Sequence, residues 1–230
     1  MPRLFSGPLL CWRDPVSTRS GPEHMALDEA ILLTTPGPAL RLHVWAAPAV
    51  TIGYFAKFTR NADDPGPPPT RRWTGGGTVE HGHDVTFSLA VPAGVSDTGT
   101  VSDRYRAIHA ALADALNASG LPARLDDGAP GPTDFRAGVC FAKPVRWDVL
   151  DAASGAKIAG GAQRRSRRGW LHQGSVRVPH PDPAAEWTAR FARNLTDGPV
   201  RDWEPGPETH DRAAELARTR YGAEAWLRRF

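Results

Sequence analysis

Cysteine and lysine are scarce in this chain, and each shortage narrows what the protein can be. Only two of the 230 residues are cysteine, Cys11 and Cys140, which is too few for the disulfide framework of a small secreted protein. The two are not spaced as a metal site, so at least one of them could be a working thiol. Lysine and arginine together number 28, yet only three of these are lysine, so arginine is the routine cation and each lysine is informative.

Long apolar runs are also missing. No stretch approaches the roughly 18 to 20 apolar residues that span a bilayer, and the apolar part of the N-terminus is too short for a secretory signal. We therefore expect a cytoplasmic protein without a membrane partner. The net charge of +3 does not call for nucleic acid as a partner. The length suits one domain over residues 1–230 with a substantial core.

Hydrophobic periodicity predicts strands and helices that do not strictly alternate. Strands are expected at residues 4–12, 39–58 (two strands broken at Ala47 and Pro48) and 84–91, followed by an antiparallel meander at 145–151, 156–165 and 170–178. Helices are expected at 22–35, which we predict to be amphipathic, between Gly99 and Gly120, and at 183–195 and 208–230. Clustered strands of this kind favour an α+β protein over a doubly wound one.

The stretch from residue 71 to residue 92 changes from basic to flexible to strand-like. Its candidate ligand-binding residues are Arg71, Arg72, Gly75, Gly76, Gly77 and His81. A glycine backbone can adopt positive φ and lie against a ligand without Cβ atoms in the way. Flanked by guanidinium groups, such a loop suits an anionic or carbonyl-bearing ligand. A plain hairpin turn has a similar composition and is the alternative.

A second glycine-bearing stretch sets Lys157 three residues before Gly160 and Gly161. A lysine there could reach an anion or a carbonyl oxygen held over the glycines. It would supply positive charge where negative charge develops. The alternative is a solvated lysine beside a hairpin turn.

Cys140 follows an irregular segment and precedes a predicted strand. A thiol becomes a nucleophile when neighbouring cations lower its pKa, and Lys143, Lys157 or His81 could do so if the fold brings them close. A free cysteine is more often a small buried hydrophobic residue, and this is the better explanation for Cys11.

The histidines and one arginine run give weaker signals. His81 and His83 lack a third ligand at a standard spacing, so we predict no metal site, with His81 bonding the ligand or the loop and His83 solvated or structural. A strand could place His172 near the same cavity. The run 164–168 is expected to be a solvated hairpin tip that could also bind a phosphate-bearing or acidic partner.

Six sequence blocks occur in a characteristic order. They are MALDEAIL, PAVTIGYF, RRWTGGGTVEHGHDVTFSL, CFAKPVRWDVLD, KIAGGAQRR and LHQGSV. Together they resemble the lipoate-protein ligase and octanoyltransferase family over about residues 20 to 180. The resemblance implies an α+β fold with a mixed, largely antiparallel sheet flanked by helices, like the catalytic domains of class II aminoacyl-tRNA synthetases and biotin protein ligases. Biotin ligases share this fold, but the layout of their glycine-arginine loop differs.

The resemblance also implies a reaction. An octanoyl or lipoyl group would pass to one lysine of a lipoyl carrier domain, in a 2-oxoacid dehydrogenase or the glycine cleavage H protein. By motif position, the acyl-donor site would contain Arg72, Gly75, Gly76, Gly77 and His81. Lys157 would contact the activated carbonyl or phosphate, and Arg71, Gly160 and His172 complete the predicted substrate-binding set.

Two branches of this family activate the acyl group differently. Ligases make an acyl adenylate with ATP and Mg²⁺, often with an accessory domain or subunit. Transferases need no cofactor and take octanoate from acyl carrier protein through a cysteine thioester. Cys140 falls where one transferase branch has its nucleophile, so we favour a transferase in which Lys157 is the electrostatic partner of Cys140. Gly77 departs from that branch, which often has arginine there. The alternatives are an ATP-dependent ligase, a non-catalytic partner subunit and, third, a nucleic-acid-binding protein.

Overall fold

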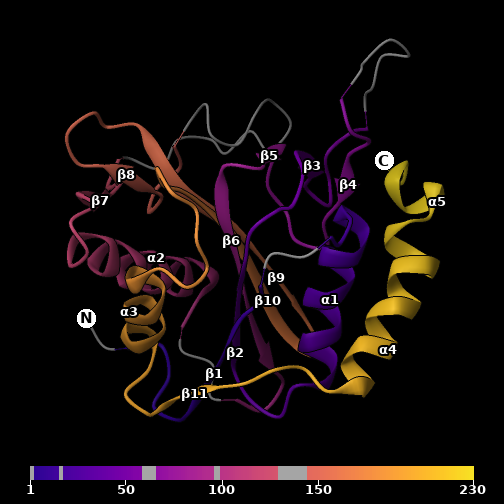
Figure 1. Cartoon of the computed structure of the whole chain (residues 1–230), viewed down its shortest axis with the longest axis horizontal. Coiled ribbons are helices and arrows are strands. Elements are labelled where there is room, and N and C mark those ends of the chain that lie inside the picture. The colour runs from indigo at the N-terminus through magenta and orange to yellow at the C-terminus, as the bar shows by residue number, and fades with distance from the viewer. Residues whose placement is uncertain (1–2, 16–17, 59–65, 96–98, 129–143) are drawn as a thin grey trace.

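The computed structural model describes residues 3–15, 18–58, 66–95, 99–128 and 144–230. Within them the chain forms two sheets (Figure 1). The larger has the order β11-β1-β2-β6-β10-β9-β8-β7 and the smaller the order β4-β3-β5. The strands are β1 (Leu9–Arg13), β2 (Ala39–His43), β3 (Ala49–Ile52), β4 (Thr70–Arg71), β5 (Val79–His81), β6 (Asp84–Pro92), β7 (Ala123–Leu125), β8 (Val149–Asp151), β9 (Lys157–Ser166), β10 (Gly169–Arg177) and β11 (Val200–Asp202).

Strand pairing in the large sheet is mixed. β1 pairs in parallel with both β2 and β11, whereas the remaining neighbours from β2 to β7 are antiparallel. The predicted meander is confirmed as β8, β9 and β10, and the turn between β8 and β9 contains Gly155 at a φ of 70°. The sheet is therefore the mixed, largely antiparallel one that the sequence predicts.

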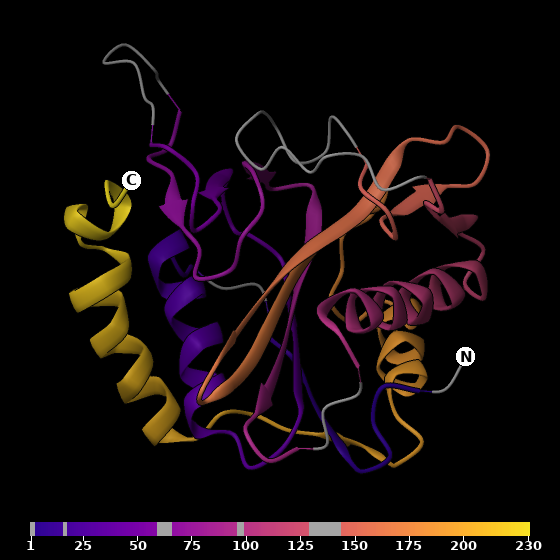
Figure 2. The same ribbon diagram turned by 180° about the vertical axis from the view of Figure 1, so that it is seen from behind.

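Helices cover both faces of the large sheet. They are α1 (Gly21–Thr34), α2 (Val101–Asn117), α3 (Glu186–Leu195), α4 (Pro207–Leu216) and α5 (Glu224–Leu227). Figures 1 and 2 show α2 and α3 on one face and α1 with α4 on the other. Two apolar clusters form accordingly, so that Leu89 of β6 packs in one and its neighbour Ala90 in the other. None of the described helices combines the length and apolar character needed to cross a bilayer.

Helix α1 begins at a capping box, in which the backbone N–H of Ser20 donates to Glu23 at 2.6 Å. The prediction that this helix is amphipathic was wrong. Every residue from His24 to Leu32 is buried, because α4 packs on the side of α1 that faces away from the sheet (Figure 1). A helix covered on both sides needs no polar face.

Four other predictions differ from the structure in extent. The expected strand 4–12 forms over Leu9–Arg13, and the expected helix 183–195 forms over Glu186–Leu195. The expected helix 208–230 is interrupted by a π-helical turn at Ala217–Tyr221 and by Gly222 before α5. The expected strand 145–151 forms only over Val149–Asp151. The short strands β4, β5, β7 and β11 were not predicted, because two or three residues carry too little periodicity to identify a strand.

Candidate functional site

One pocket brings together residues from both glycine-bearing stretches. It lies between the loop after β4, strand β5 and the facing strands β9 and β10. Among the residues that line it are Arg72, Gly76, His81, Lys157, Gly160 and Gly161. The fold thus joins two sequence blocks that are about 80 residues apart.

Arg72 holds the glycine loop in shape. Its guanidinium group donates to the carbonyl oxygens of Gly75 at 2.9 Å and Gly77 at 2.8 Å, and to the Thr51 hydroxyl at 2.7 Å. The Gly75 carbonyl and the Gly76 N–H belong to one peptide group, and the C=O and N–H of a trans peptide point in opposite directions. Because the guanidinium group holds the Gly75 carbonyl, the N–H of Gly76 points away from the guanidinium group. Gly76 has a φ of 86°, a conformation that favours glycine.

We expect Arg72→Lys to lower kcat/KM for the reaction at this site by about a hundredfold. A lysine ammonium is a point donor on a flexible stem and cannot hold two carbonyls and a hydroxyl in one plane. Steady-state kinetics beside thermal unfolding would test this, with Arg168→Lys at an exposed arginine as the matched control. Equal rates for the two variants would contradict the clamp.

His81 lies in a directed chain of hydrogen bonds. Its Nδ1 is 2.9 Å from Asp84 Oδ2, and its Nε2 is 2.9 Å from Thr51 Oγ1. An ionised carboxylate only accepts, so Nδ1 carries the proton and Nε2 accepts from the Thr51 hydroxyl, whose oxygen accepts from Arg72. The Trp45 ring stacks on the imidazole at 4.3 Å. His81 thus reaches the glycine loop through Thr51 and Arg72, and its contact with a ligand stays a prediction. His83 is exposed.

Asp84 anchors the chain of hydrogen bonds. Its buried carboxylate accepts from His81, from the backbone N–H of Gly82 at 3.2 Å, from Thr86 at 2.9 Å and from Ser175 at 2.6 Å. Burial alone would raise the pKa of Asp84, but the hydrogen bond from His81, with the donations from Ser175 and Thr86, brings the pKa below its ordinary value. Asp84 therefore stays ionised and keeps His81 in one tautomer.

Asp84→Asn should destabilise the protein by about 2 kcal/mol near neutral pH, because the amide cannot accept from all four donors. The ionised carboxylate stabilises the fold fully above the unfolded-state pKa of about 3.8. This contribution is lost as pH falls through the lower folded-state pKa. Urea unfolding from pH 7 to pH 3.5 should therefore show the gap to wild type shrinking below about pH 4. The control Asp211→Asn, at an exposed aspartate, should have the same free energy of unfolding as wild type. If the difference between Asp84→Asn and wild type stayed constant with pH, Asp84 would not be the ionised acceptor described here.

Lys157 lies in a buried ion pair. Its Nζ is 2.7 Å from Asp148 Oδ2, and 6% of the lysine side chain is exposed against 0% of the aspartate side chain. Asp148 also accepts from the Tyr105 hydroxyl at 2.6 Å and from the backbone N–H of Val145 at 2.7 Å. The alternative of a solvated lysine was wrong. The ion pair fixes the direction of the lysine side chain.

The two glycines after Lys157 make room for side chains. A Cβ on Gly160 would lie 2.5 Å from Lys157 Cε and 2.9 Å from Asp148 Oδ1. A Cβ on Gly161 would lie 2.4 Å from His172 Nε2. Contacts this short do not occur between non-bonded carbon and heavy atoms. Gly160 therefore makes room for the Lys157–Asp148 pair, and Gly161 makes room for His172.

Gln173 ties the glycine loop to helix α1, a link that sequence reasoning missed. Its Nε2 donates to Asp28 Oδ2 at 2.7 Å, and its Oε1 accepts from the Thr74 hydroxyl at 2.7 Å. Asp28 in turn accepts from Arg41 at 2.7 Å and from Ser88 at 2.8 Å. Both ends of this link lie in quoted sequence blocks, but spacing alone does not show that they meet.

Arg71 does not line the pocket, although it was predicted with Arg72 as a substrate-binding residue. Its side chain is fully buried and donates to five backbone carbonyls, those of Gly53, Tyr54, Ala56, Trp226 and Leu227. It therefore fastens the C-terminal helix to the segment after β3. Because the Arg71 guanidinium group donates to these carbonyls, it is a structural group and not one that faces a ligand.

His172 also lies away from the pocket. Neighbouring residues on a strand point to opposite faces, so Gln173 faces the pocket and His172 faces α2. There its ring stacks on Phe87 at 5.4 Å and meets Tyr105 and His109. Burial lowers the pKa of His172 well below its ordinary value, so the ring is neutral. This placement argues against its predicted contact with substrate.

Cys140, the predicted nucleophile, and Lys143 lie outside the described residues. Cys11 is buried in the core, as predicted, and burial raises the pKa of its thiol to about 11. It is therefore an unreactive thiol at neutral pH. In the described part of the chain, no group of three or more His, Cys, Asp or Glu residues could hold a metal ion.

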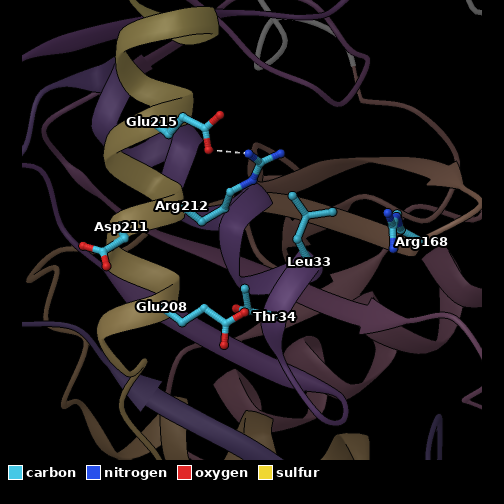
Figure 3. Close-up of a pocket in the computed structure, with 7 residues that line it drawn as sticks. All are labelled: Leu33, Thr34, Arg168, Glu208, Asp211, Arg212 and Glu215. Carbon is cyan, nitrogen blue, oxygen red and sulfur yellow. Dashed lines mark hydrogen bonds and ion pairs between the residues drawn. The ribbon is translucent and has the colours of Figure 1, made fainter.

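A second hollow opens far from the glycine loop, between α1, α4 and the β9–β10 hairpin (Figure 3). It is lined by Leu33, Thr34, Arg168, Glu208, Asp211, Arg212 and Glu215. Figure 3 shows Arg212 paired with Glu215 and the remaining charged side chains turned in different directions. Because these groups do not converge on one point, the hollow has no feature of a binding site.

The hairpin tip departs from prediction at one residue. Arg164 is not solvated: it lies 3.8 Å from the centre of the Tyr54 ring and donates to the Trp73 carbonyl at 3.1 Å. Arg165, Arg167 and Arg168 are exposed, as expected for a tip.

Comparison with known proteins gives concordant results. The model of the lipoyl protein ligase A/B catalytic domain family matches residues 20–183. Octanoyltransferase LipM of Symbiobacterium thermophilum is 32% identical over 209 residues, covering 77% of this chain and 73% of the relative. LipM of Moorella thermoacetica is 32% identical over 168 residues, covering 66% of this chain and 59% of the relative. The chain thus spans less than two thirds of the second relative.

Solved structures show the same architecture. A lipoate-protein ligase A bound with ATP superimposes with a TM-score of 0.70 at 23% identity, covering 97% of this chain and 99% of that one. A bipartite lipoate protein ligase from Thermoplasma acidophilum, described with its E2 lipoyl domain, gives 0.69 at 21% identity and covers 98% of each chain. These likenesses confirm the predicted α+β fold.

Proposed function

Because the chain belongs to the lipoyl protein ligase A/B catalytic domain family, we propose that it is an enzyme that attaches an octanoyl or lipoyl group to a lysine of a lipoyl carrier domain. One observation carries the proposal. A buried, oriented lysine and an arginine-clamped glycine loop line the same pocket. Positive charge and backbone N–H donors are what a developing oxyanion on an acyl carbonyl requires.

The favoured route is octanoyl transfer from acyl carrier protein. The Cys140 thiolate would attack the carbonyl carbon of the octanoyl thioester, forming a new C–S bond, and the carrier thiol would leave with a proton. The neutral ε-amine of the acceptor lysine would then attack the octanoyl-cysteine and form an amide as the C–S bond breaks, and the proton lost by the nitrogen would pass to the departing Cys140 sulfur. Neither step needs an oxidant or a cofactor. The family motif position of Cys140 and the LipM relatives support this route.

Lys157 would act on the carbonyl oxygen in both steps. Each attack creates a tetrahedral intermediate with negative charge on that oxygen, and an oriented ammonium at low exposure stabilises it strongly. Asp148 would be a positioning residue, because it holds the ammonium without reaching the pocket lining. The Gly76 N–H would be a second donor to the same oxygen.

An ATP-dependent ligase is the second candidate. The likeness over almost the whole chain to a ligase bound with ATP favours it. In that case the same Lys157 and Arg72 would face the phosphate of an acyl adenylate, and ATP with Mg²⁺ would be required. A non-catalytic partner subunit of such a ligase is a further alternative, and it predicts that changes at Lys157 have no effect.

We further propose a single domain over residues 1–230, a cytoplasmic location, and partners that include acyl carrier protein and the lipoyl domains of 2-oxoacid dehydrogenases or the glycine cleavage H protein. The chain would act on neither nucleic acid nor membranes.

Incubation with octanoyl acyl carrier protein and an unmodified E2 lipoyl domain, without ATP, tests the proposed function. The lipoyl domain should gain one octanoyl group by mass spectrometry. A gain that occurs only with free octanoate or lipoate, ATP and Mg²⁺ would replace the transferase with the ligase. No gain under either condition would reject both enzyme hypotheses.

A further inference from the structure

Two exposed aromatic side chains from distant parts of the chain meet on the surface. Phe55 is 70% exposed and Phe230 is 49% exposed, and their ring centres are 5.7 Å apart. Single exposed apolar residues are ordinary on a protein surface. Two adjoining exposed aromatic rings indicate a protein interface, because aromatic residues are enriched at the centres of interfaces and contribute much of the binding energy there.

This surface is built on rigid supports. The buried Tyr54 ring packs edge-on against both Phe55 and Phe230, at 4.8 and 5.4 Å. Beneath them, the Arg71 side chain joins the carbonyls of residues 53, 54 and 56 to those of residues 226 and 227. The Trp226 indole N–H closes the joint by donating to the Arg71 carbonyl at 3.0 Å. Binding there would cost little conformational entropy, as preorganised interfaces require.

Cations surround the aromatic pair. Lys57, Arg228 and Arg229 are exposed, and Arg229 lies within 5.0 to 5.7 Å of the rings of Tyr54, Trp226 and Phe230. Among the described residues, Glu224 is an acidic neighbour of these cations, and it pairs with Arg228 at 2.6 Å. We call Phe55, Lys57, Arg228, Arg229 and Phe230 the aromatic–arginine patch. Its charge complements an acidic protein surface.

The aromatic–arginine patch adjoins the pocket. The Tyr54 N–H donates to the Thr74 carbonyl at 2.8 Å, directly before the glycine loop. A Cβ on Gly53 would lie 1.8 Å from the Gly76 carbonyl oxygen, so the two segments touch. Figures 1 and 2 show α5 beside β4 at the same end of the molecule as β3 and β5. Arg71 thus supports the patch, and the next residue, Arg72, supports the ligand-facing loop.

We propose that the aromatic–arginine patch is the docking surface for the acceptor protein, a carrier domain with carboxylates around its target lysine. The inference rests on the proposed function, since it places the macromolecular substrate of the same pocket. Docking on the patch would lay the acidic face of the domain on the arginines and its target lysine over the neighbouring glycine loop.

Calorimetric titration with the unmodified E2 lipoyl domain of the same organism tests the docking directly and needs no catalysis. Phe55→Ser should weaken binding about tenfold. Arg229→Glu should weaken it more at low than at high salt. The control Val101→Ser removes another exposed apolar group, 55% exposed, at the start of α2 on the other face of the sheet, and should bind like wild type. Wild-type protein that does not bind, or a Phe55→Ser variant that binds as wild type does, would overturn the proposal.

Kinetics separate failure of docking from failure of the proposed function. Phe55→Ser should raise KM for the lipoyl domain about tenfold with kcat within about twofold, and should leave the octanoyl-carrier-dependent acylation of the enzyme unchanged. If wild type bound the lipoyl domain through Phe55 but transferred no acyl group, the proposed function would be wrong and the docking surface would stand. A wild-type dimer that Phe55→Ser dissociates in sedimentation, with unchanged lipoyl-domain binding, would make the patch a self-interface and overturn the docking.

Discussion

Replacing Lys157 with alanine is expected to lower kcat for acyl transfer by about a thousandfold. The ammonium is nearly buried and held by Asp148 at 2.7 Å, so its charge acts in a low-dielectric pocket and costs no reorganisation during the reaction. Loss of one such donor removes stabilisation that exists only in the transition state. KM for the carrier domain should therefore stay within about threefold.

The Lys157 variant needs controls for folding, because alanine leaves a buried aspartate without its cation. Lys157→Met keeps the length of the side chain and should lose the same activity, and thermal unfolding would show whether each variant folds. Lys57→Ala removes an exposed lysine of the aromatic–arginine patch and should retain kcat, with any effect confined to KM for the carrier domain. A folded Lys157→Met variant with wild-type kcat would exclude the electrostatic role and favour the non-catalytic subunit.

Cys140→Ser is expected to abolish octanoyl transfer from acyl carrier protein, with at least about a thousandfold loss. A serine hydroxyl is a far weaker nucleophile than a thiolate at neutral pH. The matched control is Cys11→Ala, since the Cys11 thiol is buried with a pKa raised to about 11. Transfer should be lost in the first variant and kept in the second. Full activity in Cys140→Ser would exclude the thioester route and favour the ligase.

Sequence reasoning predicted the order of the main elements but treated neighbouring residues as equivalent. Arg71 and Arg72 were expected to serve one ligand together. Side chains alternate between faces where the chain is extended, and here Arg71 enters the joint with α5 while Arg72 reaches the glycine loop. His172 and Gln173 likewise lie on opposite faces of β10, with Gln173 facing the pocket and His172 facing α2. A pair of like residues in sequence therefore did not predict a pair in the site.

The partners of the predicted residues were harder to find than the residues themselves. Lys157 and its glycines carried a local signal, but Asp148 did not, because a register shift at Val149 and Leu150 sets how β8 meets β9. The links from His81 to Thr51 and from Thr74 to Gln173 also depend on long-range pairing. Spacing within one strand cannot reveal such contacts. Local chemistry predicted the lysine and the glycine loop separately, and only the resemblance to the family predicted that they share one site.

The mass of the intact protein after incubation with octanoyl acyl carrier protein, in the absence of ATP, tests the central proposal most directly. Wild type should gain a single octanoyl group, Cys140→Ser should gain none, and adding an unmodified lipoyl domain should remove the group again. An unmodified wild-type protein that acylates the lipoyl domain only with ATP and a free fatty or lipoic acid would contradict it.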